Sequence, residues 1–482
     1  MNQTPNIIVI LADDMGFGDA LCYDPDYCRV PTPNIDRLAE QGMRFTDAHA
    51  TSSLCNPSRY GLLTGRYAWR SPLQRGVLGP VDPPLIADDR LTLPAMLREQ
   101  GYATACIGKW HLGWDWPERD GEVMYDAPLG GGPTERGFDT YFGDDVPNYP
   151  PYAWIEGGQV QGETTAFIEH DPVLVLNHPG PGVPDWPFDA VLPTLTQRVV
   201  DYIGEHATGQ RPFFLYFPLT TPHEPIAPSP AFKGKSGISG VADLIMETDW
   251  AVGEVMAALH AGGVAEETLL IFTTDNGHCP YTDLAPFQRV GHRVSGPYRG
   301  CRADIWEGGH RVPFVASWPG AIAAGTVCDR TISLADLMAT CAELVGVELP
   351  EDAAEDSVSA LPLLLGGRED VRSETVYHSG AGQFAVFRGP WKLALCNDGG
   401  GYWNPEEAPP GGAPPVQLYN LEDDPGERCN LIKAHPSIAV SMVAYLEHVV
   451  AEGRSTPGPR QRNDVPVDIW KGAAFEEVHY DA

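Results

Sequence analysis

The chain has 482 residues, 43% of them hydrophobic, which is the composition of a globular protein with a large buried core. It carries 32 Lys and Arg against 65 Asp and Glu, so its formal net charge is −33. Surfaces that bind nucleic acid or anionic membranes are basic, and neither partner is expected here. An anionic substrate would require a local cluster of cationic side chains within this acidic protein.

The sequence has no pattern typical of membrane insertion or export. No apolar run reaches the roughly 18 residues that a membrane-spanning helix needs. The first residues, Met1 to Pro5, lack the basic segment that begins a signal peptide. As written, the sequence therefore predicts a cytoplasmic protein, whereas a trimmed N-terminus would fit a periplasmic or secreted one. The oligomeric state is left open.

Short apolar segments alternate with helical patterns over most of the chain. A helix is predicted from Pro33 to just before Gly42, with Thr32 as its N-cap. Residues 241–259 keep one apolar face at helical spacing. This alternation predicts an α/β fold, with a large mixed, mostly parallel sheet sandwiched by helices. The predicted buried strands are residues 6–11, 102–107, 212–217 and 268–273.

The pattern changes near residue 372, after which the apolar segments are shorter and closer together. They predict a short antiparallel sheet, followed by an amphipathic helix over 438–449 that packs on it. We therefore expect a main domain over residues 1–372 and a smaller C-terminal subdomain over residues 373–482. The predicted short strands are 375–377, 384–387 and 391–395, and a Pro- and Gly-rich insert follows at 404–415.

Polar side chains follow each of the four predicted buried strands. Ligands of open α/β sheets bind beyond the carboxyl ends of the strands, so these side chains are expected at one rim. Clustered oxygen ligands suit Ca²⁺, Mg²⁺ or Mn²⁺, whereas Zn²⁺ would favour more His or Cys. Each motif alone is more often structural, and their coincidence indicates a site. The residues are Asp13, Asp14, Lys109, His111, His223, Asp275 and Asn276.

A further helix is predicted to begin at Cys55. Pro57 suits a first helical turn, and the helical pattern continues to Gly65. Cys55 would then stand at a helix N-terminus, where free N–H groups and the helix dipole favour an anion. For an isolated Cys-x-Pro-x-Arg, a buried free cysteine before an ordinary helix would be the preferred interpretation.

The complete segment from Cys55 to Arg66, Cys-Asn-Pro-Ser-Arg-Tyr-Gly-Leu-Leu-Thr-Gly-Arg, resembles the signature of the sulfatase family. This family contains arylsulfatase-like, formylglycine-dependent enzymes of the alkaline phosphatase superfamily. The resemblance extends over most of the chain, because further motifs match in the family's order. These motifs are Asp13-Asp14, Gly108 to Gly113, Pro222-His223, Thr274 to Gly277, Trp306 to Pro313, Leu418 to Leu421 and Asp424 to Glu427.

The resemblance implies that Cys55 is oxidised by a formylglycine-generating enzyme, which reads a motif that includes Pro57 and Arg59. The hydrated aldehyde is the nucleophile of the family. The resemblance also implies a bound divalent metal, usually Ca²⁺. Its implied ligands are Asp13, Asp14, Asp275, Asn276 and the modified Cys55.

The remaining roles are implied in the same way. Arg59 would hold the hydrated aldehyde, and Lys109 would contact the sulfate. His223 would protonate the leaving alcohol and contact the substrate, and His111 would take a proton from the second hydroxyl. One position departs from the family, because Arg302 stands where a lysine is usual. Arginine keeps the charge for substrate contact but does not release a proton at neutral pH, so acid catalysis falls to His223.

The expected function is hydrolysis of an aryl or carbohydrate sulfate monoester to an alcohol and inorganic sulfate. A phosphate or phosphonate monoester hydrolase with the same site is a second hypothesis, and a non-catalytic binding protein on a degenerate sulfatase scaffold is a third. The natural substrate is not readable from these motifs. Aromatic residues in the loops over residues 144–155 and 170–188 are candidates for substrate contacts, although packing is the commoner role for each of them.

Overall fold

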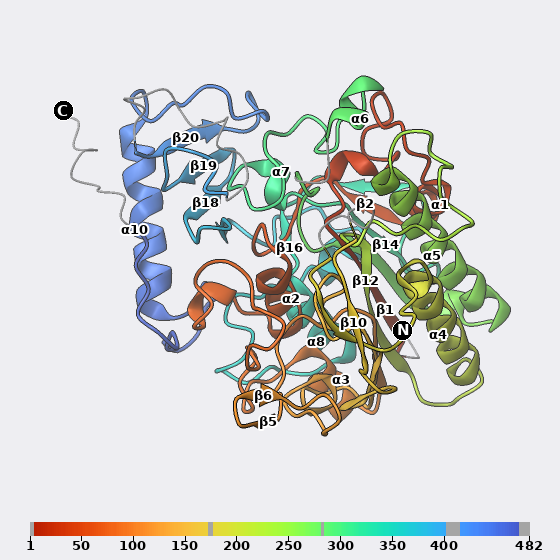
Figure 1. The fold of residues 1–482 in the computed structure, drawn as a ribbon. Helices are drawn as coiled ribbons and strands as arrows, with labels where there is room; N and C mark the ends of the chain where they lie inside the picture. The colour runs from red at the N-terminus through yellow and green to blue at the C-terminus, as the bar shows by residue number, and fades with distance from the viewer. Residues whose placement is uncertain (1–3, 172–176, 281–283, 402–414, 472–482) are drawn as a thin grey trace.

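The computed structural model describes residues 4–171, 177–280, 284–401 and 415–471. Its centre is a ten-stranded sheet (Figure 1). The strand order is β15 (Thr326–Cys328), β2 (Met43–Phe45), β14 (Phe314–Ser317), β13 (Thr268–Thr274), β1 (Asn6–Asp13), β12 (Phe213–Pro222), β4 (Ala103–Ile107), β7 (Thr140–Gly143), β8 (Ile155–Glu156) and β9 (Gln159–Val160). The strands from β13 to β7 pair in parallel, while β14 and β8 join antiparallel at either side. The predicted mixed, mostly parallel sheet is confirmed.

Helices cover both faces of this sheet (Figure 1). One face packs against α1 (Pro33–Gln41), α4 (Val191–His206) and α5 (Gly240–Ala261), and the other against α2 (Cys55–Thr64), α3 (Leu93–Glu99) and α8 (Asp336–Val345). Alternate side chains of β1 enter the two cores, Ile8 and Ile10 on the first face and Ile7 and Val9 on the second. Each fully buried aliphatic side chain stabilises the fold by about 1.5–3 kcal/mol relative to exposure.

The four predicted buried strands form, as β1, β4, β12 and β13, and β12 continues to Pro222. Helix α1 also begins at Pro33 and ends before Gly42, as predicted. The side chain of Thr32 does not cap it, because tertiary contacts compete for the hydroxyl. Thr32 Oγ1 accepts from the backbone N–H of Leu21 at 2.9 Å and donates to Asp36 Oδ1 at 3.3 Å.

A separate four-stranded antiparallel sheet forms in the C-terminal part. Its strands are β17 (Glu374–His378), β18 (Phe384–Arg388), β19 (Trp391–Ala394) and β20 (Gln417–Asn420), and α10 (Pro436–Glu452) packs on it (Figure 1). Tyr67 and Trp69 share this core. The domain boundary at residue 372 stays a prediction, and most of the insert at 404–415 lies outside the described residues.

A buried ionic network joins this small sheet to the short helix that precedes β14. Lys392 Nζ, on β19, lies 2.9 Å from Glu307 Oε1 and 2.9 Å from Glu427 Oε1. Glu307 begins the short helix α7 (Glu307–His310), and its second oxygen accepts from Arg311 Nε at 2.6 Å. The backbone N–H of Glu307 donates to Glu427 Oε2 at 2.7 Å. The network thus links the two late sequence motifs in space.

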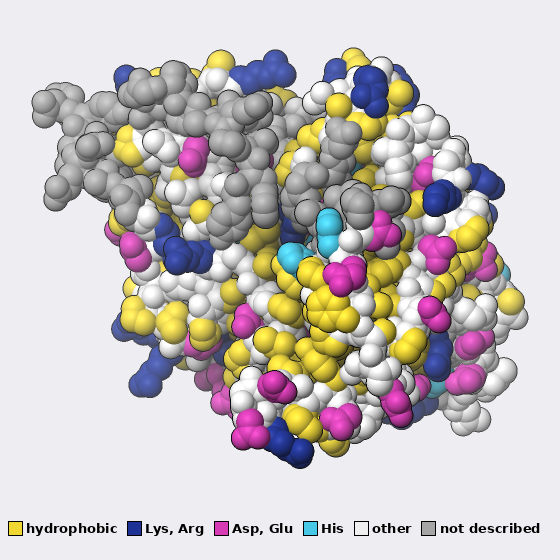
Figure 2. Space-filling model, viewed as in Figure 1, with side chains coloured by type: hydrophobic (Ala, Val, Ile, Leu, Met, Phe, Trp, Pro, Cys, Tyr) yellow, Lys and Arg dark blue, Asp and Glu magenta, His cyan; other side chains and the backbone are white. Residues whose placement is uncertain are grey.

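Acidic side chains are spread over the face shown in Figure 2, in keeping with the net charge of −33. Across the described part of the chain, no helix combines the length and the apolar character needed to cross a membrane.

Candidate active site

The polar residues predicted to share one rim lie together. Asp13 ends β1 and Asp14 follows it. Lys109 follows β4, His223 follows β12, and Asp275 with Asn276 follows β13. These four strands are parallel neighbours, so their carboxyl ends meet at the same edge of the sheet. All of these side chains are buried.

Cys55 is the first residue of α2, with Pro57 in the first turn as predicted. Arg302 Nη2 donates to Cys55 Sγ at 3.2 Å, and Sγ lies 3.8 Å from Asp14 Oδ1. Burial raises the pKa of the Cys55 thiol, against the opposing effects of Arg302 and Lys109. A raised pKa makes a thiol a weaker nucleophile, because the thiolate is the reactive form.

Arg59, one turn further along α2, ties the helix to the ends of two strands. Its Nε and Nη2 donate to Asp275 Oδ2 at 3.1 and 2.8 Å, and its Nη1 donates to the Lys109 carbonyl at 3.1 Å. Lys109 Nζ donates in turn to Asp13 Oδ2 at 2.6 Å. Arg59 and Lys109, both fully buried, thus form hydrogen-bonded ion pairs with two carboxylates that are buried as deeply.

Three buried oxygen atoms in this cluster are candidate ligands for a cation. Within the described ranges, Asp13 Oδ1, Asp14 Oδ2 and Asn276 Oδ1 accept no hydrogen bond. Asp13, Asp14 and Asp275 place one carboxylate oxygen each within 4.8 Å of the others. Burial and the neighbouring Asp13 raise the pKa of Asp275 to about 7, because the carboxylates crowd one another. These oxygen donors fit a hard divalent cation such as Ca²⁺ or Mg²⁺.

His111 lies beside the cationic end of the cluster. Its backbone φ is 51°, an unusual value for a residue with a side chain, and its N–H donates to Asp145 Oδ1 at 3.0 Å. Nε2 lies 3.2 Å from the Leu78 carbonyl, so Nε2 carries the hydrogen and the buried Nδ1 is an acceptor. Burial, followed by Lys109 and Arg59, lowers the pKa of His111 well below its usual value, which favours a neutral imidazole.

The Nε2 edge of the His223 ring faces the cluster. Its Nε2 lies 3.8 Å from Asp14 Oδ2. Its Nδ1 lies 2.8 Å from the Glu224 carbonyl and 3.2 Å from Glu224 Oε2. Nδ1 therefore carries a hydrogen and donates it to the Glu224 carbonyl, while Glu224 Oε2 accepts no hydrogen bond from any described residue.

Arg302 is the third cationic side chain of the site. Its Nε lies 3.0 Å from Asp14 Oδ1, in addition to the Nη2 contact with Cys55. Arg302, Arg59 and Lys109 form the local cationic cluster that an anionic substrate requires in an acidic protein, and all three are buried.

Sequence comparison matches residues 5–347 to the family described as Sulfatase. The chain belongs to the sulfatase family. It is 35% identical to the N-acetylgalactosamine-6-O-sulfatase of Bacteroides thetaiotaomicron, with 93% of each chain covered. It is also 35% identical to arylsulfatase A of Homo sapiens, over 89% of this chain and 84% of that protein. The named relatives are sulfuric ester hydrolases, and this sulfatase is an enzyme of that class.

Solved structures agree with this assignment. A structure from work on the metabolism of multiple glycosaminoglycans by Bacteroides thetaiotaomicron matches the sulfatase with a TM-score of 0.84 and 33% identity, covering 93% of this chain and 99% of that one. A sulfatase from Pseudoalteromonas sp. matches with a TM-score of 0.73 and 27% identity, covering 93% of this chain and 90% of that one.

Two acidic residues at the site of this sulfatase were not predicted from sequence. Glu224 directly follows His223, and neighbouring side chains in an extended segment point to opposite sides, so their pairing is not visible in the sequence. Asp145 holds the backbone of His111 from a position 34 residues further along the chain. A buried acidic pair, Asp144-Asp145, directly after the apolar strand β7 was the available signal.

Proposed function

We propose that this sulfatase hydrolyses a carbohydrate or aryl sulfate monoester to the alcohol and inorganic sulfate, with Cys55 converted to formylglycine and Ca²⁺ bound beside it. The observation that carries the proposal is the position of Cys55. It begins a helix, lies against Arg302, and adjoins a cluster of buried oxygen donors. A cysteine-derived nucleophile, a cation and a metal site would then converge on one anionic group.

The metal site is proposed from the donor set. Asp13, Asp14, Asp275 and Asn276 supply oxygen atoms, and residue 55 would complete the shell. Ca²⁺ is the preferred ion, and Mg²⁺ or Mn²⁺ would be accepted by similar ligands. When bound, the ion supplies positive charge where negative charge develops on the sulfate oxygens.

The nucleophile is proposed at position 55. Oxidation of Cys55 by a formylglycine-generating enzyme, followed by hydration, supplies a hydroxyl for in-line attack on the sulfur atom. Arg59 would hold this hydroxyl pair in place, and its two hydrogen bonds to Asp275 keep the guanidinium rigid. Lys109 and Arg302 would contact the sulfate oxygens from the cationic side of the site.

Proton transfer is proposed for the two histidines. His223 presents Nε2 to the cluster and would protonate the leaving alcohol oxygen. His111 presents a buried acceptor nitrogen, Nδ1, and would take a proton from the second hydroxyl at position 55. Arg302 contributes charge but no proton, so the leaving group depends on His223.

A carbohydrate sulfate is the favoured substrate class. The relative named N-acetylgalactosamine-6-O-sulfatase covers 93% of this chain, and the structure quoted above with a TM-score of 0.84 comes from work on glycosaminoglycans. Tyr149 and His178 stack with ring centroids 4.0 Å apart. Burial raises the pKa of the Tyr149 hydroxyl, and the charge of Arg302 opposes that rise. The stacked pair suits the apolar face of a sugar ring.

The second hypothesis keeps the site and changes the ester. A phosphate or phosphonate monoester would also place an anionic group between the cations and the metal. The test is the ratio of kcat/KM for 4-nitrophenyl sulfate and 4-nitrophenyl phosphate, measured on protein co-produced with a formylglycine-generating enzyme. Preference for the sulfate supports the proposal, and a clear preference for the phosphate would contradict it.

A further inference from the structure

We propose that Glu224 is a positioning residue for His223, pairing its carboxylate with Nδ1 of the protonated ring so that Nε2 is held toward the leaving oxygen of the substrate. The inference rests on the proposed sulfate ester hydrolysis. It adds a second residue to the part of the site that protonates the leaving group.

The pairing is close and buried. His223 is 4% exposed and Glu224 is fully buried. Nδ1 of His223 donates to the Glu224 backbone carbonyl at 2.8 Å, and Glu224 Oε2 lies 3.2 Å from the same nitrogen as an ion-pair partner that accepts no hydrogen bond within the described part of the chain. The other carboxylate oxygen, Oε1, accepts from Cys279 Sγ at 3.8 Å, which restrains the carboxylate on its far side.

The opposite edge of the ring faces the reacting group. Nε2 of His223 lies 3.8 Å from Asp14 Oδ2, and Asp14 in turn contacts Cys55 and Arg302. The imidazole therefore lies between a carboxylate that holds its orientation and the place where the ester bond breaks. Because Nδ1 carries its own hydrogen, Nε2 has a proton to donate only in the doubly protonated ring, and a rotated ring would direct that N–H elsewhere.

The proton balance assigns each atom a role. A hydroxyl of the hydrated aldehyde at position 55 forms a new S–O bond and gives its proton to a neighbouring carboxylate of the oxygen-donor cluster. The ester S–O bond breaks in the same step, and its electron pair stays on the leaving oxygen. That oxygen takes the proton from Nε2 of His223, which leaves a neutral imidazole with its hydrogen on Nδ1, facing Glu224. Because Arg302 does not release a proton, no second donor compensates for a misaligned His223.

The test compares two leaving groups in the same variants. Glu224→Gln and Glu224→Ala are assayed on 4-nitrophenyl sulfate, whose leaving group needs little protonation, and on a monosaccharide 6-sulfate, whose alkoxide needs it fully. General acid catalysis contributes about 10²- to 10⁴-fold, so kcat on the sugar sulfate should fall by at least about tenfold in Glu224→Ala. On the aryl sulfate the fall should stay within about threefold, and KM should change little for both substrates.

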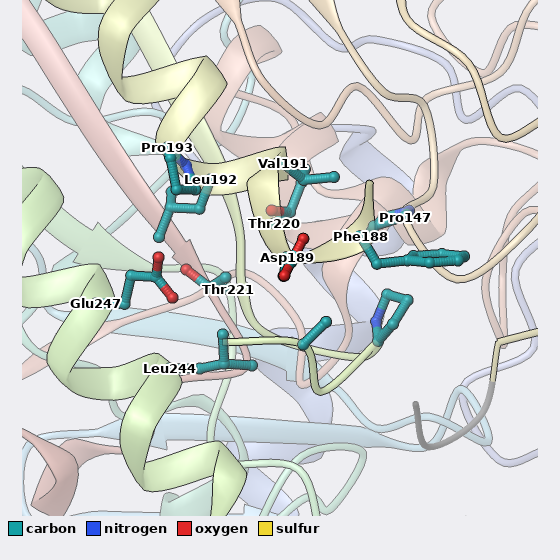
Figure 3. Close-up of a pocket in the computed structure, with 12 residues that line it drawn as sticks. Pro147, Phe188, Asp189, Val191, Leu192, Pro193, Thr220, Thr221, Leu244 and Glu247 are labelled. Atoms are coloured by element: carbon teal, nitrogen blue, oxygen red, sulfur yellow. The ribbon is translucent and has the colours of Figure 1, made fainter. Parts of the chain in front are cut away.

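Glu247→Gln is the matched control. Glu247 is also a buried carboxylate with a pKa raised by burial, and it accepts from the Ser229 backbone N–H at 3.0 Å. It extends from α5 toward Thr221, near the end of the strand that leads to His223 (Figure 3). Any change in kcat for this variant should be equal on the two substrates.

The double variant His223→Ala with Glu224→Gln separates positioning from a merely structural role. If Glu224 acts through His223, the double variant loses no more kcat on the sugar sulfate than His223→Ala alone. Equal losses on both substrates in a folded Glu224→Gln, or additive losses in the double variant, would overturn the inference. A wild-type protein inactive on every sulfate ester would instead contradict the proposed function itself.

Discussion

Arg302 donates a hydrogen bond from Nη2 to the Sγ of Cys55 at 3.2 Å. The same guanidinium lies 3.0 Å from Asp14 through Nε, so one side chain faces both the position of the nucleophile and the oxygen-donor cluster. The charge is buried and fixed before any substrate arrives. Preorganised cations of this kind stabilise charge that develops in a transition state.

Replacing Arg302 tests the importance of that charge. Arg302→Ala should lower kcat/KM for a sulfate ester by about 10²-fold or more, as removal of a single preorganised donor does in other enzymes. Arg302→Lys restores the residue usual in the family and should retain activity within about tenfold of wild type. The measurement is steady-state kinetics on 4-nitrophenyl sulfate. Equal activity of the alanine and wild-type proteins would contradict a sulfate contact at this position.

Removal of divalent metal tests the oxygen-donor cluster independently of activity. With Ca²⁺ at about 100 times its Kd, binding should stabilise the folded protein by about 2.7 kcal/mol, so a chelator should lower Tm and added Ca²⁺ should restore it. The buried and otherwise unpartnered Oδ1 of Asn276 is one proposed ligand atom, and Asn276→Ala should weaken this response. A Tm unaffected by chelator and by Ca²⁺ would contradict the site.

The ionic network behind the small sheet is open to a stability test. Lys392→Met leaves the carboxylates of Glu307 and Glu427 buried without their shared cation, which should reduce the free energy of unfolding by about 3–5 kcal/mol. Lys235→Met is the matched control, because Lys235 is exposed and its loss should change stability by less than about 0.5 kcal/mol. Urea unfolding followed by fluorescence measures both, and equal midpoints would refute this account of the network.

The grouping of polar residues at one rim could be predicted from sequence, because it depends only on where neighbouring parallel strands end. Parallel neighbouring strands end at the same edge, so the polar residues after β1, β4, β12 and β13 had to meet once those four apolar segments were recognised. The position of Pro57 predicted a helix that begins at Cys55, and α2 does begin at Cys55. Local patterns were sufficient wherever the relevant contact lay at the end of a regular element.

Contacts between distant or adjacent side chains did not follow from sequence. Lys392 and Glu307 are 85 residues apart, and no periodicity indicates that they pair. Glu224 lies next to His223 in sequence, yet only the path of the turn after β12 turns its carboxylate back to the imidazole. Thr32 lies at the expected cap position, but its hydroxyl forms hydrogen bonds with Leu21 and Asp36 instead of capping the helix.

The most direct test of the account is the chemical state of residue 55 measured together with activity. Peptide mass spectrometry of protein co-produced with a formylglycine-generating enzyme should show residue 55 with an oxygen in place of sulfur and two hydrogens fewer. That preparation should hydrolyse 4-nitrophenyl sulfate, and Cys55→Ala should be inactive while retaining the wild-type Tm within a few degrees. A protein that hydrolyses the sulfate ester equally well with an unmodified thiol, or with alanine at position 55, would contradict the central claim.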